Sequence, residues 1–183
     1  MKIRTQAGAA ALFLFAVAPA AADVLPGPTA GQKSVIVRAG IVLPQGDMKA
    51  SLKSGYLVGL AWRSQFSEIM GLEGELGWQM NSRLSTEGSI HLLGPQTLAV
   101  RIQIPLPVVV PFALAGGGIF LPIASFDQFE VGWNAGVLLG GGVEIYLGKA
   151  TSLGADVQYR RFFESGGQNL SEIQAALRVG FHY

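Results

Sequence analysis

The sequence predicts an all-β fold, an eight-stranded antiparallel up-and-down transmembrane β-barrel, and three observations support this prediction. The chain opens with the pattern of an export signal, its strand candidates alternate apolar with polar residues, and the connections between them alternate in length. Half of the residues are hydrophobic and 25 are glycine, yet beyond residue 22 no run approaches the ~18 apolar residues of a spanning helix. A closed barrel also crosses a bilayer with every backbone polar group paired.

Residues 1–22 have the three parts of a secretory signal peptide. Lys2 and Arg4 give a positive start, residues 9–17 an apolar core, and residues 20–22 a small-residue cleavage site. We therefore expect a cleaved signal peptide (1–22), a short periplasmic lead-in (23–33) and the barrel (34–183). The chain has no cysteine, which excludes disulfides and thiolate chemistry. Its formal net charge of +1 gives no case for a nucleic-acid partner.

Eight segments show the period of two that a strand requires. The last is the plainest, because every second residue from Ile173 to Tyr183 is apolar or aromatic and those between are polar or small. The other predicted strands are 34–43, 56–63, 72–81, 97–104, 110–120, 131–147 and 151–163. Their connections alternate long and short, as in outer-membrane barrels with short periplasmic turns and longer outer loops. Both chain ends are therefore expected in the periplasm.

Aromatic residues fall near the ends of the predicted strands. Amphipathic rings prefer the headgroup region of a bilayer, and outer-membrane barrels carry two girdles of them. The expected membrane-interface aromatics are Tyr56, Trp62, Trp78, Phe112, Phe120, Trp133, Tyr159, Phe163, Phe181 and Tyr183. Aromatics that fill a soluble core would not sort to strand ends.

The polar face of the strands carries charges of both signs. The residues expected to form an ion network in the lumen are Arg38, Arg63, Glu73, Glu75, Arg101, Glu144, Asp156, Arg160 and Arg178. An eight-stranded barrel is only wide enough for side chains to fill its interior, and buried ions left unpaired are costly. We therefore expect a lumen plugged by arginine–carboxylate pairs. A small narrow channel is the alternative if the pairs do not close it.

Residues 148–160 read Gly-Lys-Ala-Thr-Ser-Leu-Gly-Ala-Asp-Val-Gln-Tyr-Arg, a short turn that runs into a strand. With the signal peptide, the strand pattern and the aromatic C-terminus, this segment resembles the small bacterial outer-membrane barrels of the OmpA and OmpX type. The resemblance implies an integral protein of the Gram-negative outer membrane with a structural or surface-interaction role through its extracellular loops. It implies a chain without a peptidoglycan-binding domain, and no cofactor or metal is expected.

The same resemblance implies partners. Phe181 and Tyr183 would be the assembly signal that the barrel assembly machinery reads, and outer-membrane lipid and lipopolysaccharide would surround the barrel. Arg161 shares the parity of the lipid-facing residues. It would either extend its charge to the membrane interface or contact a lipopolysaccharide phosphate.

Two other functions are weighed against this one. Glu87, Ser89 and His91 recur at every second position and supply the residue types of a serine hydrolase. Barrel enzymes that deacylate lipopolysaccharide use such residues near the outer rim, but the order here is Ser-x-His and theirs is His-x-Ser. Ordinary loop residues explain the three better, so no enzyme is expected. A soluble carrier of the lipocalin kind would need apolar residues inside, whereas here the charges occupy one face.

Overall fold

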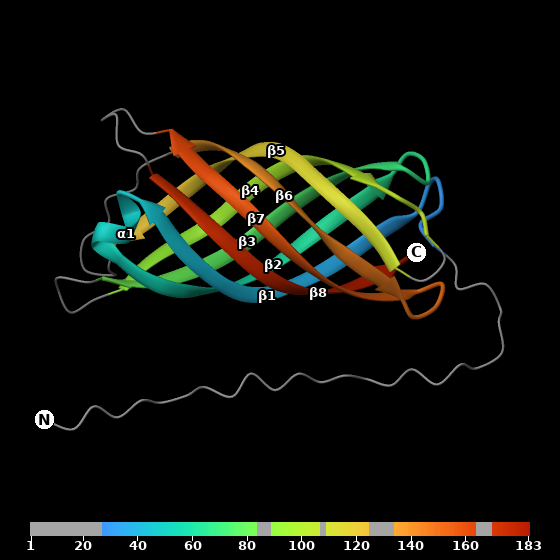
Figure 1. Cartoon of the computed structure of the whole chain (residues 1–183), viewed down its shortest axis with the longest axis horizontal. Helices are drawn as coiled ribbons and strands as arrows, with labels where there is room; N and C mark the ends of the chain where they lie inside the picture. Colours follow the sequence, from blue (N-terminus) through green and yellow to red (C-terminus); the bar gives the residue numbers. More distant parts are fainter. Residues whose placement is uncertain (1–26, 84–88, 107–108, 125–133, 164–169) are drawn as a thin grey trace, which may run out of the picture.

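A closed antiparallel barrel makes up most of the described structure. The structure is a computed structural model that describes residues 27–83, 89–106, 109–124, 134–163 and 170–183. The strands are β1 (Lys33–Gly46), β2 (Leu52–Gln65), β3 (Met70–Arg83), β4 (Ser89–Gln103), β5 (Val109–Ala124), β6 (Asn134–Tyr146), β7 (Thr151–Phe163) and β8 (Leu170–His182). Each strand pairs with the next, and β8 pairs with β1 to close the barrel (Figure 1). The predicted fold class is confirmed.

The strands present an apolar outer wall and a polar interior. Along β2 the burial alternates residue by residue, with Tyr56 and Leu60 exposed and Leu57 and Ala61 buried. In β8 Leu177 is 71% exposed, whereas its neighbour Arg178 is 1% exposed. A water-soluble barrel would show the opposite arrangement, because exposed apolar area is costly in water. The outer wall is therefore suited to lipid.

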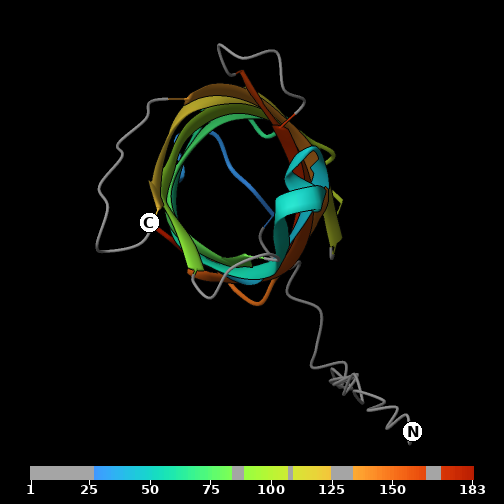
Figure 2. The ribbon, with the colours of Figure 1, turned by 90° about the vertical axis from the view of Figure 1, so that its left-hand side faces the viewer.

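One helical turn, α1 (Met48–Ser51), connects β1 to β2. It lies at the end of the barrel opposite the C-terminus (Figure 1) and partly covers the opening there (Figure 2). Met48 is buried against Phe120 and Phe162, which point into the barrel. Among the described residues, no helix is long and apolar enough to cross a membrane.

The fourth strand begins earlier than the sequence pattern predicts. The predicted strand 97–104 is the second half of β4, and Ser89 marks the actual start. The pairing of β4 with β5 shifts register between Leu93 and Gln96, and Gly94-Pro95 lies in this interval. A bulge changes the alternation of faces, and proline removes a ladder donor. The alternation in the sequence is therefore interrupted although the strand continues.

Glycines allow the strands to approach one another closely inside the barrel. A Cβ atom added at Gly142 would collide with the carbonyl oxygen of Ala155 in β7, and one added at Gly116 would collide with that of Leu98 in β4. The glycine runs in β5 and β6 therefore serve close packing, as expected for a small barrel.

The segment before β1 crosses the barrel end that holds the C-terminus. The Gly31 N–H donates to the Gln65 carbonyl over 2.8 Å, and the Gln65 N–H donates to the Gln32 carbonyl over 2.9 Å. Gly31 has φ +82°, a left-handed conformation that favours glycine. Pro28 is buried. Figure 2 shows this segment, in blue, across the far opening.

Candidate functional site

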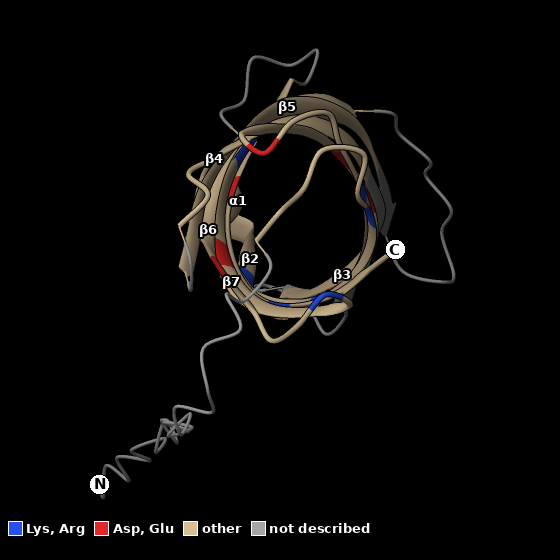
Figure 3. Ribbon diagram, turned by 90° about the vertical axis from the view of Figure 1, so that its right-hand side faces the viewer, with Lys and Arg blue, Asp and Glu red and all other residues tan. Residues whose placement is uncertain are grey.

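Within the described part of the chain, the barrel interior holds five arginines and five carboxylates, and no more than 7% of any of these residues is exposed. They are Arg38, Arg63, Arg101, Arg160 and Arg178 with Glu73, Glu75, Glu144, Asp156 and Glu172. We call this set the lumen network. Figure 3 shows charges of both signs around the barrel wall. The formal charges of the ten groups cancel, so no net charge has to be buried.

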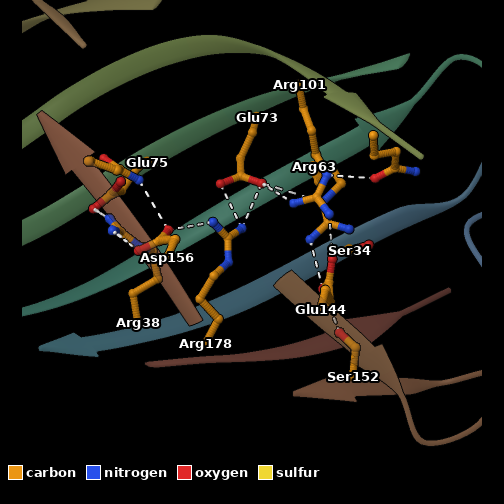
Figure 4. Close-up of polar contacts among 12 residues, drawn as sticks. Ser34, Arg38, Arg63, Glu73, Glu75, Arg101, Glu144, Ser152, Asp156 and Arg178 are labelled. Atoms are coloured by element: carbon orange, nitrogen blue, oxygen red, sulfur yellow. Dashed lines mark hydrogen bonds and ion pairs between the residues drawn. The ribbon is translucent and has the colours of Figure 1, made fainter. Parts of the chain in front are cut away.

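Asp156 and Glu73 anchor the middle of the lumen network. Arg38 Nη2 and Arg178 Nη1 each donate to an oxygen of Asp156, both over 2.8 Å. Arg178 Nη2 donates to both carboxylate oxygens of Glu73, over 2.7 Å. Arg38 also pairs with Glu75. These residues come from β1, β3, β7 and β8, and they meet in the lumen in Figure 4.

Glu144 organises the half nearer the C-terminus. Arg63 Nη2 lies 3.0 Å from Glu144 Oε1, and Arg101 Nη2 lies 2.7 Å from Glu144 Oε2. Arg63 Nε and Arg101 Nη1 also lie 3.4 and 3.7 Å from Glu73 Oε2. Glu73 thus joins this half to the middle through Arg178 (Figure 4). Charge-assisted hydrogen bonds of this kind compensate the desolvation of the ions.

Amide side chains complete the half nearer α1. Arg160 Nη2 lies 3.1 Å from Glu75 Oε2 and donates to Gln158 Oε1 over 2.8 Å. Glu172 accepts hydrogen bonds from Gln79 and Gln174, over 2.8 and 2.7 Å. Glu172 was not among the residues expected in the lumen, because the predicted last strand starts at residue 173 and β8 starts at Leu170. Glu172 lies two residues before Gln174 and therefore shares its lumen-facing parity.

Phe112 and Phe120 face the lumen, and their predicted place at the membrane interface is wrong. They are only 6% and 2% exposed. The Arg101 guanidinium lies 3.7 Å from the centroid of the Phe112 ring, which favours a cation–π contact. Phe120 meets Phe162 edge to face, with centroids 4.5 Å apart. The parity prediction assumed that the larger side chains of this strand face lipid, but its exposed positions are Val109, Ala113, Ala115 and Ile119.

Seven of the other predicted interface aromatics lie on the outer wall, at 41% to 76% exposure. These are Tyr56, Trp62, Trp78, Tyr159, Phe163, Phe181 and Tyr183. Trp133 lies outside the described residues.

A directed chain of hydrogen bonds leads from the first strand to Glu144. The Ser152 hydroxyl donates to Glu144 Oε1 over 2.6 Å, so its oxygen is left to accept from His182 Nε2, 2.9 Å away. His182 Nδ1 then accepts from the Ser34 hydroxyl over 2.7 Å. The Tyr146 ring stacks on the His182 ring at 4.9 Å between centroids. This chain of hydrogen bonds was not predicted, although Ser34, Ser152 and His182 have the parity of the lumen residues.

Both ends of the lumen network are covered. At the α1 end, Met48, Leu52, Phe120 and Phe162 form a buried apolar cluster, with Leu170 packed against it. We call this cluster the apolar cap. At the other end, the segment before β1 crosses the opening and hydrogen-bonds to the backbone of Gln65. The polar interior is thus enclosed between an apolar layer and a backbone segment.

A family model for the outer membrane protein beta-barrel domain matches residues 7–183, which is almost the whole chain. The chain belongs to this family. Its members are outer-membrane barrels, so the protein is assigned to the bacterial outer membrane. No curated protein matches the chain at a significant level.

Solved structures of outer-membrane barrels share the fold at low sequence identity. Neisserial surface protein A (NspA) is 12% identical with a TM-score of 0.63, over 82% of this chain and 98% of that one. Ail, the attachment invasion locus protein of Yersinia pestis, is 16% identical with a TM-score of 0.58, over 85% and 100%. The N-terminal barrel domain of Pseudomonas aeruginosa OprF is 14% identical with a TM-score of 0.58, over the same shares.

Of the three residues of the serine-hydrolase hypothesis, the structure gives the strand position of two. In this barrel Ser89 and His91 belong to β4, where the register pairs them with Ser82 and Met80 of β3. Glu87 lies outside the described residues. Within the described ranges, no group of three or more His, Cys, Asp or Glu side chains is arranged to hold a metal ion.

Proposed function

We propose that this protein is a closed outer-membrane barrel that acts through its extracellular loops, in a structural or surface-interaction role. The observation that carries this proposal is the charge-balanced lumen network, in which five arginines and five carboxylates are buried side by side. A diffusion pore needs a continuous water path, whereas paired ions, an apolar cap and a covering backbone segment occupy the interior here. The lumen is therefore proposed to be sealed.

The proposed orientation places the C-terminus in the periplasm and α1 outside the cell. The end with the C-terminus carries the short connections, such as residues 147–150 between β6 and β7. The other end carries α1, and the described ends of β3 and β4, of β5 and β6, and of β7 and β8 meet there because the strands are antiparallel. Short periplasmic turns and longer outer loops are the rule for bacterial barrels. Residues 1–22 are proposed to be the cleaved signal peptide and residues 23–33 the periplasmic lead-in.

Partners follow from this orientation. Phe181 and Tyr183, at the end of the closing strand, are proposed as the signal for the barrel assembly machinery. Phe181 is 49% and Tyr183 76% exposed on the outer wall, so both rings are accessible to another protein before the barrel is inserted. Outer-membrane lipid and lipopolysaccharide are proposed to contact the apolar wall.

An epitope-insertion experiment tests the orientation and the surface role. An epitope placed between residues 85 and 86 is expected to bind antibody on intact cells, because this connection lies on the α1 side. The matched control carries the same epitope between Gly148 and Lys149, and antibody should reach it only after the outer membrane is permeabilised. The opposite pattern would reverse the barrel and remove the proposed surface role of these loops.

A barrel enzyme acting on lipopolysaccharide acyl chains is the alternative function. It rests on Ser89 and His91, which lie two residues apart in β4 towards the α1 end. Ser89→Ala and His91→Ala variants in intact cells separate the two functions, with the acylation pattern of lipid A as the readout.

A further inference from the structure

His182 is one of two histidines in the chain, and it faces the interior at the barrel end that holds the C-terminus. It is 7% exposed, so a proton added to its ring would be a buried positive charge. Histidine is the side chain whose ordinary pKa, about 6.5, puts its change of charge closest to neutral pH. The charge of His182 can therefore change in a pH range where ordinary carboxylates and guanidinium groups keep theirs.

The hydrogen bonds around His182 determine which ring nitrogen carries the proton. The Glu144 carboxylate is paired with two arginines and has no proton to give, so the Ser152 hydroxyl donates to it, over 2.6 Å (Figure 4). Ser152 has a single proton, and its oxygen therefore accepts from His182 Nε2, 2.9 Å away. Nδ1 is then unprotonated and accepts from the Ser34 hydroxyl over 2.7 Å. This arrangement fits the neutral imidazole.

A second proton, on Nδ1, would reverse the hydrogen bond to Ser34. The ring would donate to the Ser34 oxygen, and the proton of the Ser34 hydroxyl would need a new acceptor. Ser34 is 1% exposed, so bulk water does not replace the lost acceptor. A buried donor without a partner is costly. Protonation of His182 therefore breaks a contact of the folded barrel.

Among the described residues, the titratable and charged side chains that face the His182 ring come from β2, β4 and β6. They are Arg63 of β2, Arg101 of β4, and Glu144 and Tyr146 of β6. β1 and β7 face the ring with the hydroxyls of Ser34 and Ser152, and the lysines of this rim, Lys33 and Lys149, are exposed.

These charges are already balanced without a proton on His182. Arg63 and Arg101 share the Glu144 carboxylate, over 3.0 and 2.7 Å. An imidazolium would be a third cation beside this carboxylate. Within the described part of the chain, five buried arginines already meet five buried carboxylates, so the added charge would have no partner of its own. A buried charge without a partner destabilises the folded state.

The position of His182 makes this cost act on the closure of the barrel. His182 pairs with Ser34 in the register of β8 with β1, which is the seam between the last and the first strand. Its backbone N–H donates to the Ala150 carbonyl, over 2.8 Å, and its ring reaches Ser152 of β7. One imidazole therefore contacts both strands beside β8.

We propose that His182 makes the closing seam acid-sensitive, so that the seam is fastened while the imidazole is neutral and loosens when the ring takes up a proton. This regulatory property goes beyond the proposed surface role and does not depend on which barrel end faces outwards. Protonation breaks contacts that exist only in the folded barrel, so acid favours the unfolded chain. The binding of one proton changes the unfolding equilibrium by at most about tenfold for each pH unit.

Unfolding by urea at several pH values tests the proposal. The mature chain, without the proposed signal peptide, is refolded into phosphatidylcholine vesicles between about pH 7.5 and 5.5, where histidine titrates and ordinary carboxylates do not. The intensity of the folded band on a gel gives the unfolding equilibrium constant. The variants are His182→Gln, whose amide can donate and accept without gaining a charge, and His91→Gln as the matched control at the other histidine.

The unfolding constant of the natural chain and of His91→Gln is expected to rise about tenfold as the pH falls through this range. His182→Gln should show no such rise. A pH-independent constant in the natural chain, or an equal rise in His182→Gln, would overturn the proposal.

A second measurement serves if His182→Gln does not fold. His91→Gln leaves a single histidine, so the imidazole signals in its NMR spectrum report the protonation of His182 in the folded barrel. Protonation and the loss of stability should occur over the same pH range. A ring that gains its proton without any loss of stability, or a loss of stability while the ring stays neutral, would contradict the acid-sensitive seam.

Discussion

His182 in the last strand and Ser34 in the first strand are joined by a hydrogen bond of 2.7 Å across the seam that closes the barrel. Through Ser152 the same imidazole reaches Glu144, so one side chain links β1, β6, β7 and β8. All these groups are buried, with no more than 7% of any of them exposed. The seam is therefore fastened by side chains as well as by the backbone ladder.

Replacement of His182 by alanine is expected to weaken this seam. The change removes two hydrogen bonds. The buried Ser34 hydroxyl loses its acceptor, at a cost of about 1–3 kcal/mol, whereas the Ser152 hydroxyl keeps its bond to Glu144. Urea unfolding of the barrel in lipid vesicles measures the loss. Lys149→Ala, an exposed change near the same rim, serves as the control. Equal stability of His182→Ala and Lys149→Ala would show that the hydrogen bonds of His182 contribute nothing to the stability of the barrel.

Asp156→Asn should be among the most damaging single changes in the lumen. Asp156 pairs with both Arg38 and Arg178, so its neutralisation leaves a buried excess of positive charge. Breaking a buried pair by removing one partner costs about 3–5 kcal/mol. The free energy of unfolding in vesicles is the readout, with Lys33→Gln as an exposed control within about 0.5 kcal/mol of the natural chain.

A second substitution separates charge balance from other effects of Asp156→Asn. Arg38→Gln in the same chain restores the neutrality of the lumen network. The double variant is expected to be more stable than the sum of the two single losses predicts, by about 1 kcal/mol or more, as for residues that share one network. Strict additivity would mean that the two side chains do not act as a pair.

Phe112→Ala tests the inward placement of this ring. The variant loses a buried side chain under the Arg101 guanidinium, and truncation of a buried phenylalanine costs about 3–5 kcal/mol. Phe163→Ala, on the exposed face of β7, should cost less, because its ring packs against lipid only from outside. Vesicle unfolding compares the two variants. A larger loss of stability for Phe163→Ala than for Phe112→Ala would contradict the inward placement of Phe112.

Ser89→Ala and His91→Ala are expected to leave the lipid A acylation pattern of the cell unchanged. The reason is that the protein is proposed to act through its loops and not by hydrolysis. Mass spectrometry of extracted lipid A provides the measurement, with expression level checked by the folded band on a gel. The enzyme would be established instead if lipid A from cells with the natural protein lacked one acyl chain and lipid A from cells with either variant retained it.

The alternation of residues was enough to predict the barrel, the strand number and nine of the ten buried ions. The alternation was sufficient because a barrel wall has lipid on one side and a polar lumen on the other. Successive side chains of each strand face these two sides in turn. Glu172 escaped only because the predicted last strand was too short at its start.

The residue pattern gave the wrong facing for side chains where the lumen is not polar. Phe112 and Phe120 face inward, where Phe112 contacts the Arg101 guanidinium and Phe120 contacts the Phe162 ring. Both partners come from other strands. Parity alone cannot tell which face of β5 is the lumen, because both faces of this strand carry apolar residues and glycine. The chain Ser34–His182–Ser152 likewise joins residues up to 148 positions apart, and only the closed register brings them together.

Single-channel recording of the refolded chain in a planar bilayer tests the sealed lumen most directly. The lumen network, the apolar cap and the covering segment together predict no steady conductance from protein that migrates as a folded band. An otherwise folded Glu144→Ala variant should give brief openings at most, because Glu73 still holds Arg63 and Arg101. Steady, reproducible conductance from the natural chain would contradict the account and make the protein a small channel.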